Sequence, residues 1–175
     1  MAGCSSVRLP PALTDEELDF IRNHKPLNVS VDVKEDSMYP AYSRQLYETL
    51  KGINVFKEVT YNKPESSGGK TEYVAEMKWR DYHTNSPQFM VTFVTFGIIP
   101  SWKEENHGVS FLLKSTGNPP ETRNIEVAWS GTTLKGWVMS FANFSSDRSS
   151  DGPYDSKRYF DRMKLAVMKA LAAAK

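Results

Sequence analysis

The sequence predicts an α+β fold, with a mostly antiparallel sheet, two main helices packed on one face of it, and a short N-terminal helix. Three observations predict this fold. Several short segments alternate apolar and polar residues, which is typical of half-buried strands. Segments 36–51 and 156–174 instead repeat apolar residues every three or four positions, as amphipathic helices do. Finally, the second half of the chain runs from strand pattern to strand pattern before its last helix, which favours a meander over alternating parallel units.

Length and composition fit one domain. A chain of 175 residues is long enough to bury a core without disulfides. Its 39% hydrophobic and 25% charged residues are ordinary for a globular protein, and its 12% aromatic share favours a sheet. The formal net charge of +1 gives no attraction to nucleic acid, which usually requires a strongly basic domain. We therefore expect no nucleic-acid partner.

A short helix is expected immediately after residue 13. Pro10 and Pro11 keep the chain before it extended. Thr14 and Glu17 have the spacing of a capping box, in which each side chain binds the backbone N–H of the other. Pro26 ends the helix.

The strands that follow are predicted by period-two alternation. Segment 89–96 is apolar on both faces, which predicts the most central strand. Segment 97–102 is expected to bend the chain, 117–120 to form a hairpin connection, and Gly131 to turn the chain again. The longest apolar run, 89–100, is too short to span a membrane. The other expected strands are 27–33, 55–61, 73–80, 107–114, 123–129 and 134–144.

Two longer helices complete the fold. In segment 36–51 the proline at position 40 sits in the first turn, and Gly52 provides the stop. Basic residues outnumber acidic ones along segment 156–174. We interpret them as a solvated face, with contact to anionic headgroups or to a partner as the alternative. The apolar positions of the first helix are Tyr39, Tyr42, Leu46, Tyr47 and Leu50; those of the second are Phe160, Met163, Val167, Leu171 and Ala174.

The first six residues, Met1-Ala2-Gly3-Cys4-Ser5-Ser6, resemble the lipobox of bacterial lipoproteins. In that family a signal peptidase cuts before the cysteine, which then carries the lipid. The usual pattern is Leu-Ala-Gly-Cys, and Met1 stands in place of the leucine, as when a start codon replaces a removed signal peptide. The resemblance implies a lipid on Cys4, residues 1–13 as a lipidated tether, and residues 14–175 as a single α+β domain.

The resemblance also implies a location. In such lipoproteins a serine after the cysteine, here Ser5, goes with the outer membrane, so we expect the periplasmic face of that membrane in the cell envelope. The body of the chain is similar to small envelope lipoproteins of uncharacterised function. The likeness lies in a helix with the pattern of Tyr42, Leu46 and Leu50 and in a bend like 97–100. No catalytic residue is carried over with it.

Reactive motifs are missing from the sequence. It has no G-x-S-x-G elbow and no metal-binding spacing of histidines or cysteines. An acidic loop with Asp147, Asp151 and Asp155 lacks the closing glutamate of an EF-hand, so turn and cap roles explain it better. Three histidines, His24, His83 and His107, are expected at the surface, at turns or strand ends. We expect no enzyme activity, no catalytic residue, no metal and no cofactor.

The late tryptophans Trp102, Trp129 and Trp137 are the candidates for a binding surface. Exposed, they could bind a sugar or a peptide. The alternative, which we favour, is that they fill the core between sheet and helices.

The predicted function is a membrane-anchored, periplasm-facing binding or envelope-assembly accessory without catalysis, with an unknown protein or small molecule as partner. One alternative is a cytosolic α+β domain that binds a ligand or protein and carries no lipid, with Met1 as its true start. Another is a hydrolase whose active-site residues are dispersed in the sequence.

Overall fold

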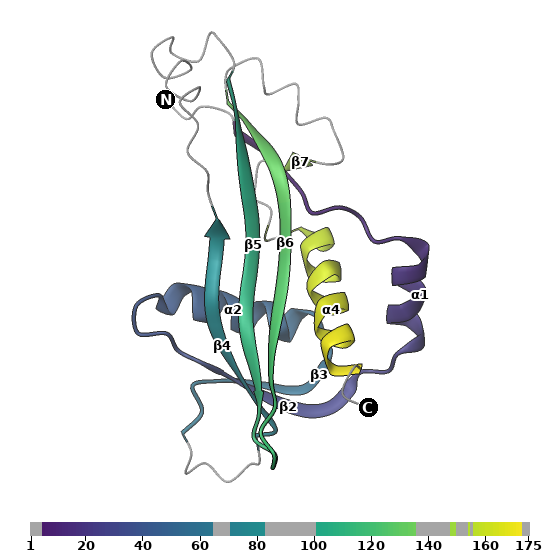
Figure 1. Cartoon of the computed structure of the whole chain (residues 1–175), viewed down its shortest axis with the longest axis vertical. Helices are drawn as coiled ribbons and strands as arrows, with labels where there is room; N and C mark the ends of the chain where they lie inside the picture. The colour runs from purple at the N-terminus through teal and green to yellow at the C-terminus, as the bar shows by residue number, and fades with distance from the viewer. Residues whose placement is uncertain are drawn as a thin grey trace. The chain divides into compact units, whose positions relative to one another are not determined.

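The computed structural model describes residues 5–64, 71–82, 101–135, 148–149, 154 and 156–172. The predicted α+β class is confirmed (Figure 1). The helices are α1 (Asp15–Asn23), α2 (Pro40–Gly52) and α4 (Lys157–Ala172). The strands are β1 (Ser5–Arg8), β2 (Leu27–Lys34), β3 (Phe56–Tyr61), β4 (Tyr73–Tyr82), β5 (Ser101–Ser115), β6 (Thr122–Lys135) and β7 (Arg148–Ser149).

The chain divides into two compact units. The first unit comprises residues 1–12, 81–108 and 128–159, and the second comprises residues 13–80, 109–127 and 160–175. Strands β5 and β6 contribute residues to both. The strand order is β5-β6-β1-β7 in the first unit and β3-β2-β4-β5-β6 in the second.

The sheet is mixed, with more antiparallel than parallel pairs among those that can be assigned. Strand β1 is antiparallel to β6 and to β7. Strands β5 and β6 form the predicted hairpin, closed where the Ser115 N–H donates to the Glu121 carbonyl at 2.7 Å. Strand β2 is parallel to both β3 and β4. Because parallel neighbours need a crossover connection, α2 lies between β2 and β3 in the sequence and packs on both strands.

The core of the second unit lies between these strands and the helices. Apolar side chains from β2, α2, β5, β6 and α4 are buried together. Helices α2 and α4 meet at Gly52, where an added Cβ would lie 2.9 Å from Cε1 of Phe160. The core residues include Val31, Val33, Leu46, Leu50, Phe111, Leu113, Ile125, Val127, Met163 and Val167.

The expected turn at Gly131 is wrong, because strand β6 continues past it to Lys135. Of the expected bend at 97–102, the last two residues belong to β5, and 97–100 lie outside the described residues. Pairing with β1, which aligns Ser5 with Lys135, continues the ladder beyond the glycine. The prediction missed this because β1 lies within the segment expected as a tether, and a local pattern does not show a distant partner strand. The expected strand 89–96 and residues 136–144 lie outside the described residues.

In the described part of the chain, no helix is long and apolar enough to cross a membrane.

The contact between Gly52 and Phe160 gives a first prediction. Gly52→Ala should lower the free energy of unfolding by about 1 kcal/mol, because overpacking costs roughly 1–3 kcal/mol and alanine's helix propensity offsets up to about 1. In a Phe160→Leu background the same substitution should lose most of this penalty, as urea unfolding would measure. An equal cost in both backgrounds would contradict the contact.

Candidate functional site

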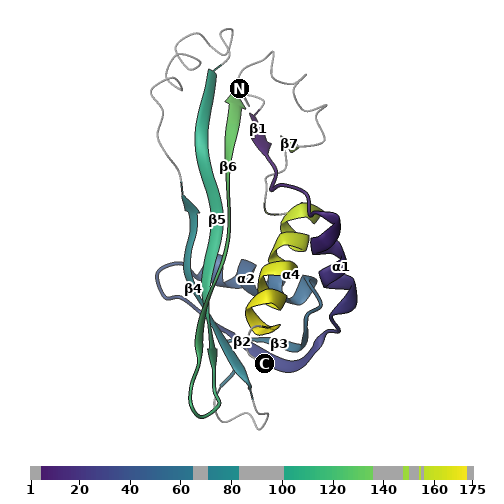
Figure 2. The same cartoon turned by 45° about the vertical axis from the view of Figure 1, so that its right-hand side comes forward.

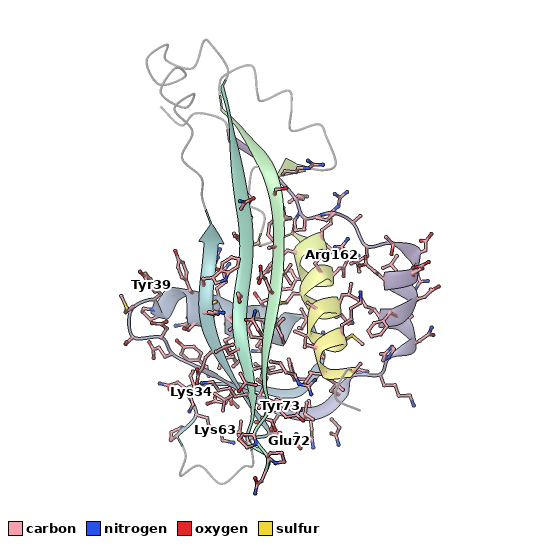
Figure 3. The ribbon with its side chains drawn as sticks, viewed as in Figure 1. Lys34, Tyr39, Lys63, Glu72, Tyr73 and Arg162 are labelled. Atoms are coloured by element: carbon pink, nitrogen blue, oxygen red, sulfur yellow. The ribbon has the colours of Figure 1, made fainter. Side chains whose placement is uncertain are left out.

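The loop between β2 and α2 carries two exposed large apolar side chains. Met38 is 75% exposed and Tyr39 is 54% exposed. Tyr39 was expected on the apolar face of a helix, but α2 begins only at Pro40, so Tyr39 occupies the cap position. Figure 3 shows Tyr39 at the end of α2 that lies away from α4. We call Met38, Tyr39, Tyr42 and Arg80 the Tyr39 surface.

The backbone of this loop is fixed by Asp36. Its Oδ1 accepts the backbone N–H groups of Met38 at 2.7 Å and of Tyr39 at 3.2 Å. Its own N–H donates to Oγ of Ser43, a fully buried residue of α2, at 2.9 Å. Such bonds from an aspartate to the backbone two and three residues on define a turn, here the one that leads into α2. The loop is therefore ordered although its apolar side chains face solvent.

The side chains of the surface are ordered as well. The rings of Tyr39 and Tyr42 stack with centroids 5.6 Å apart and an interplanar angle of 15°. The guanidinium carbon of Arg80 lies 5.3 Å from the Tyr42 ring centroid, within cation–π range. Tyrosine, methionine and arginine are enriched in the cores of protein interfaces. Side chains that are already held in place lose less conformational entropy on binding, which favours affinity.

A buried carboxylate lies elsewhere in the second unit: Asp32 on β2 is 2% exposed. Its Oδ1 accepts from Oγ1 of Thr60 at 2.8 Å and from the Lys63 N–H at 3.0 Å, and its Oδ2 lies 3.0 Å from Nζ of Lys34. Lys34 and Lys63 lie close together in Figure 3. Since all three partners come from β2, β3 or the segment after β3, the carboxylate ties the ends of these two parallel strands together. Its role is structural.

The tryptophans predicted as a surface are only partly described. Trp129 is 7% exposed, and its indole N–H donates to the Arg8 carbonyl at 3.1 Å. Its ring centroid lies 5.6 Å from that of Tyr154 and 6.2 Å from that of Tyr159. Trp129 is therefore a core residue of the first unit, as the favoured alternative had it. Trp137, the Trp102 side chain and Cys4 lie outside the described residues.

His107 corrects another expectation. It is 4% exposed and lies within β5, where its ring contacts Trp129 and Tyr154. The alternation of residues 107, 109, 111 and 113 contains the signal for this burial, which the prediction of a surface histidine overlooked. His24 is exposed as expected and stacks on Phe20, and His83 lies outside the described residues.

Among the described residues, no group of three or more histidine, cysteine, aspartate or glutamate side chains could hold a metal ion. Most of the acidic loop at 147–155 lies outside the described residues.

No family model and no curated protein sequence matches this chain. Similar solved structures include two of the PelC dodecamer from Paraburkholderia phytofirmans. A single-residue variant is 17% identical, with 78% of this chain and 83% of that chain covered and a TM-score of 0.29. The other structure is 16% identical, with 96% of each chain covered and a TM-score of 0.30. At these TM-scores the likeness carries no argument about fold or function.

The order of the Tyr39 surface gives a second prediction. Asp36→Ala should lower the free energy of unfolding by about 1 kcal/mol, because the backbone N–H groups of Met38 and Tyr39, just before α2, lose their acceptor. The control is Asp19→Ala, which removes an exposed ion pair with Arg22 and should cost less than about 0.5 kcal/mol. Chemical denaturation measures both variants. Equal costs would show that Asp36 does not order the loop.

Proposed function

We propose that this chain is a non-catalytic binding or assembly accessory of the bacterial cell envelope, held at the periplasmic face of the outer membrane by a lipid on Cys4. The observation that carries the binding role is the Tyr39 surface. The resemblance of Met1–Ser6 to a lipobox supports the anchor and the location.

The binding role follows from order combined with exposure. Single exposed apolar residues are normal on a protein surface. Here Met38 and Tyr39 are adjacent, Tyr39 stacks on Tyr42, and Asp36 fixes the backbone between β2 and α2. A buried serine, Ser43, in turn anchors Asp36. These contacts hold apolar side chains in fixed positions although they are exposed to water. We propose that a partner covers them when it binds.

The anchor is tested by metabolic labelling. Cells that express the full-length gene product with labelled palmitate should yield labelled protein, and Cys4→Ser should remove the label. Ser5→Asp should keep the label but shift the protein toward the inner membrane, as the resemblance implies. Unlabelled wild-type protein would favour the cytosolic alternative and reject the anchor.

The binding surface is tested separately by site-specific photocrosslinking in cells. A photoreactive phenylalanine analogue at Tyr39 should give an adduct of one defined mass, while the same analogue at exposed Lys57 on β3 should give none. Asp36→Ala should reduce the adduct at position 39, because the loop loses its order. No adduct at position 39, or the same adducts at both positions, would reject the Tyr39 surface while leaving the anchor untouched.

A further inference from the structure

Helix α1 is held differently from the other helices of the second unit. It lies beside α4 in two views (Figures 1 and 2). None of its residues is buried, whereas α2 buries four residues. Its apolar residues, Leu18, Phe20 and Ile21, are all partly exposed. Burial alone therefore holds α1 weakly.

An ion-pair cluster joins α1 to α4. Oε1 of Glu17 lies 3.0 Å from Nη1 of Arg162 and 3.9 Å from Nζ of Lys169. The Glu17 and Arg162 side chains are 21% and 22% exposed. Arg162 and Lys169 are seven residues apart and share a face of α4, and Leu165, 4% exposed, lies between them on that face. Figure 3 shows Arg162 on α4.

Glu17 has a double role. Its Oε2 accepts the Thr14 N–H at 3.1 Å, which completes the predicted capping box. This hydrogen bond is the main reason that the pKa of Glu17 is lowered; burial opposes the shift, and the charges of Arg162 and Lys169 add to it. The same carboxylate thus serves the helix cap and the two cations of α4.

The two helices have opposite charge along their length. Helix α1 contains four acidic residues and one basic residue, and α4 contains five basic residues and one acidic residue. The sequence left open whether the basic face of this last helix is solvated or meets an anionic partner. In the structure, acidic α1 occupies part of that face.

The segments on either side of α1 allow it to move. Residues 9–14 and 24–26 belong to no helix or strand. Undocking α1 would thus break no strand ladder, and none of the residues of α1 is itself buried. Elements with few buried contacts open locally at much lower free energy than the whole fold.

We propose that α1 is a strap that undocks as a unit, and that the α4 face beneath it then binds an acidic amphipathic helix of a partner protein. Helix α1 indicates what the partner helix must carry: a carboxylate that lies between Arg162 and Lys169, and apolar residues one turn further along the helix. This is helix-in-groove recognition with the groove occupied at rest by the chain itself. The inference depends neither on the lipid nor on the Tyr39 surface.

Hydrogen exchange of the full chain tests the strap. Amides of α1 should exchange faster than those of α4, and faster still in high salt, because salt weakens ion pairs that reach solvent, as the one with Lys169, 54% exposed, does. Glu17→Gln should raise the exchange rate of the α1 amides about two- to fivefold, since glutamine keeps the capping box but loses the charge that pairs with α4. The matched control is Glu16→Gln in the same turn, which should leave the exchange rate of the α1 amides unchanged. Equal protection of α1 and α4, or equal effects of the two substitutions, would overturn the strap.

A peptide in trans tests the binding face. The probe is a fluorescent peptide with the sequence of residues 12–25, followed by anisotropy against the full chain. Glu17→Lys in the chain repels both cations and favours the open strap, so the peptide should bind this variant about tenfold more tightly than the wild type, because the competent state is more populated. Leu18→Ser with Ile21→Ser opens the strap without a charge change and should act the same way. Equal binding to closed and open chains, or binding of a peptide that itself carries Glu17→Lys, would overturn the proposal.

Discussion

The parallel pairing of β2 with both β3 and β4 determines how the second unit is arranged. Parallel neighbours cannot be joined by a tight turn, so the chain must cross over between β2 and β3, and α2 is that crossover. Val31 and Val33 on β2 are fully buried and Asp32 on the other face is buried with hydrogen bonds, which fixes the register, because a slip by one residue would exchange the apolar and the charged positions. Asp32, between them in sequence, closes the ends of β2 and β3 through Thr60 and Lys63.

The same crossover places the Tyr39 surface. Since α2 starts just after the end of β2, the connecting loop must reverse the chain within a few residues, and Asp36 provides the acceptors for that reversal. Leu46 and Leu50 of α2 are buried, whereas Met38 and Tyr39 at the turn before α2 remain exposed. The turn therefore holds two exposed apolar side chains in a fixed place, and binding of a partner there is our proposal.

Helices of the second unit are held by two different forces. Helix α4 buries Met163 and Val167, so the hydrophobic effect holds it. Helix α1 buries no residue and depends on Glu17, whose partners Arg162 and Lys169 are themselves partly solvated. Hydrophobic burial does not respond to ionic strength as exposed charge pairs do. This difference makes α1 the element that can move while the rest of the unit stays folded.

The sequence by itself determined the local elements: the capped helix at Thr14, the alternating strands β2 to β4, the hairpin at 117–120 and the apolar face of the last helix. Each of these elements depends on the spacing of side chains within a few residues, and this spacing can be read from the sequence. The tertiary structure alone decided the exposure of Tyr39, the strand β1, and the pairing of Glu17 with Arg162. Each of these depends on a segment distant in sequence, and spacing shows which side of an element is apolar without showing what packs on it.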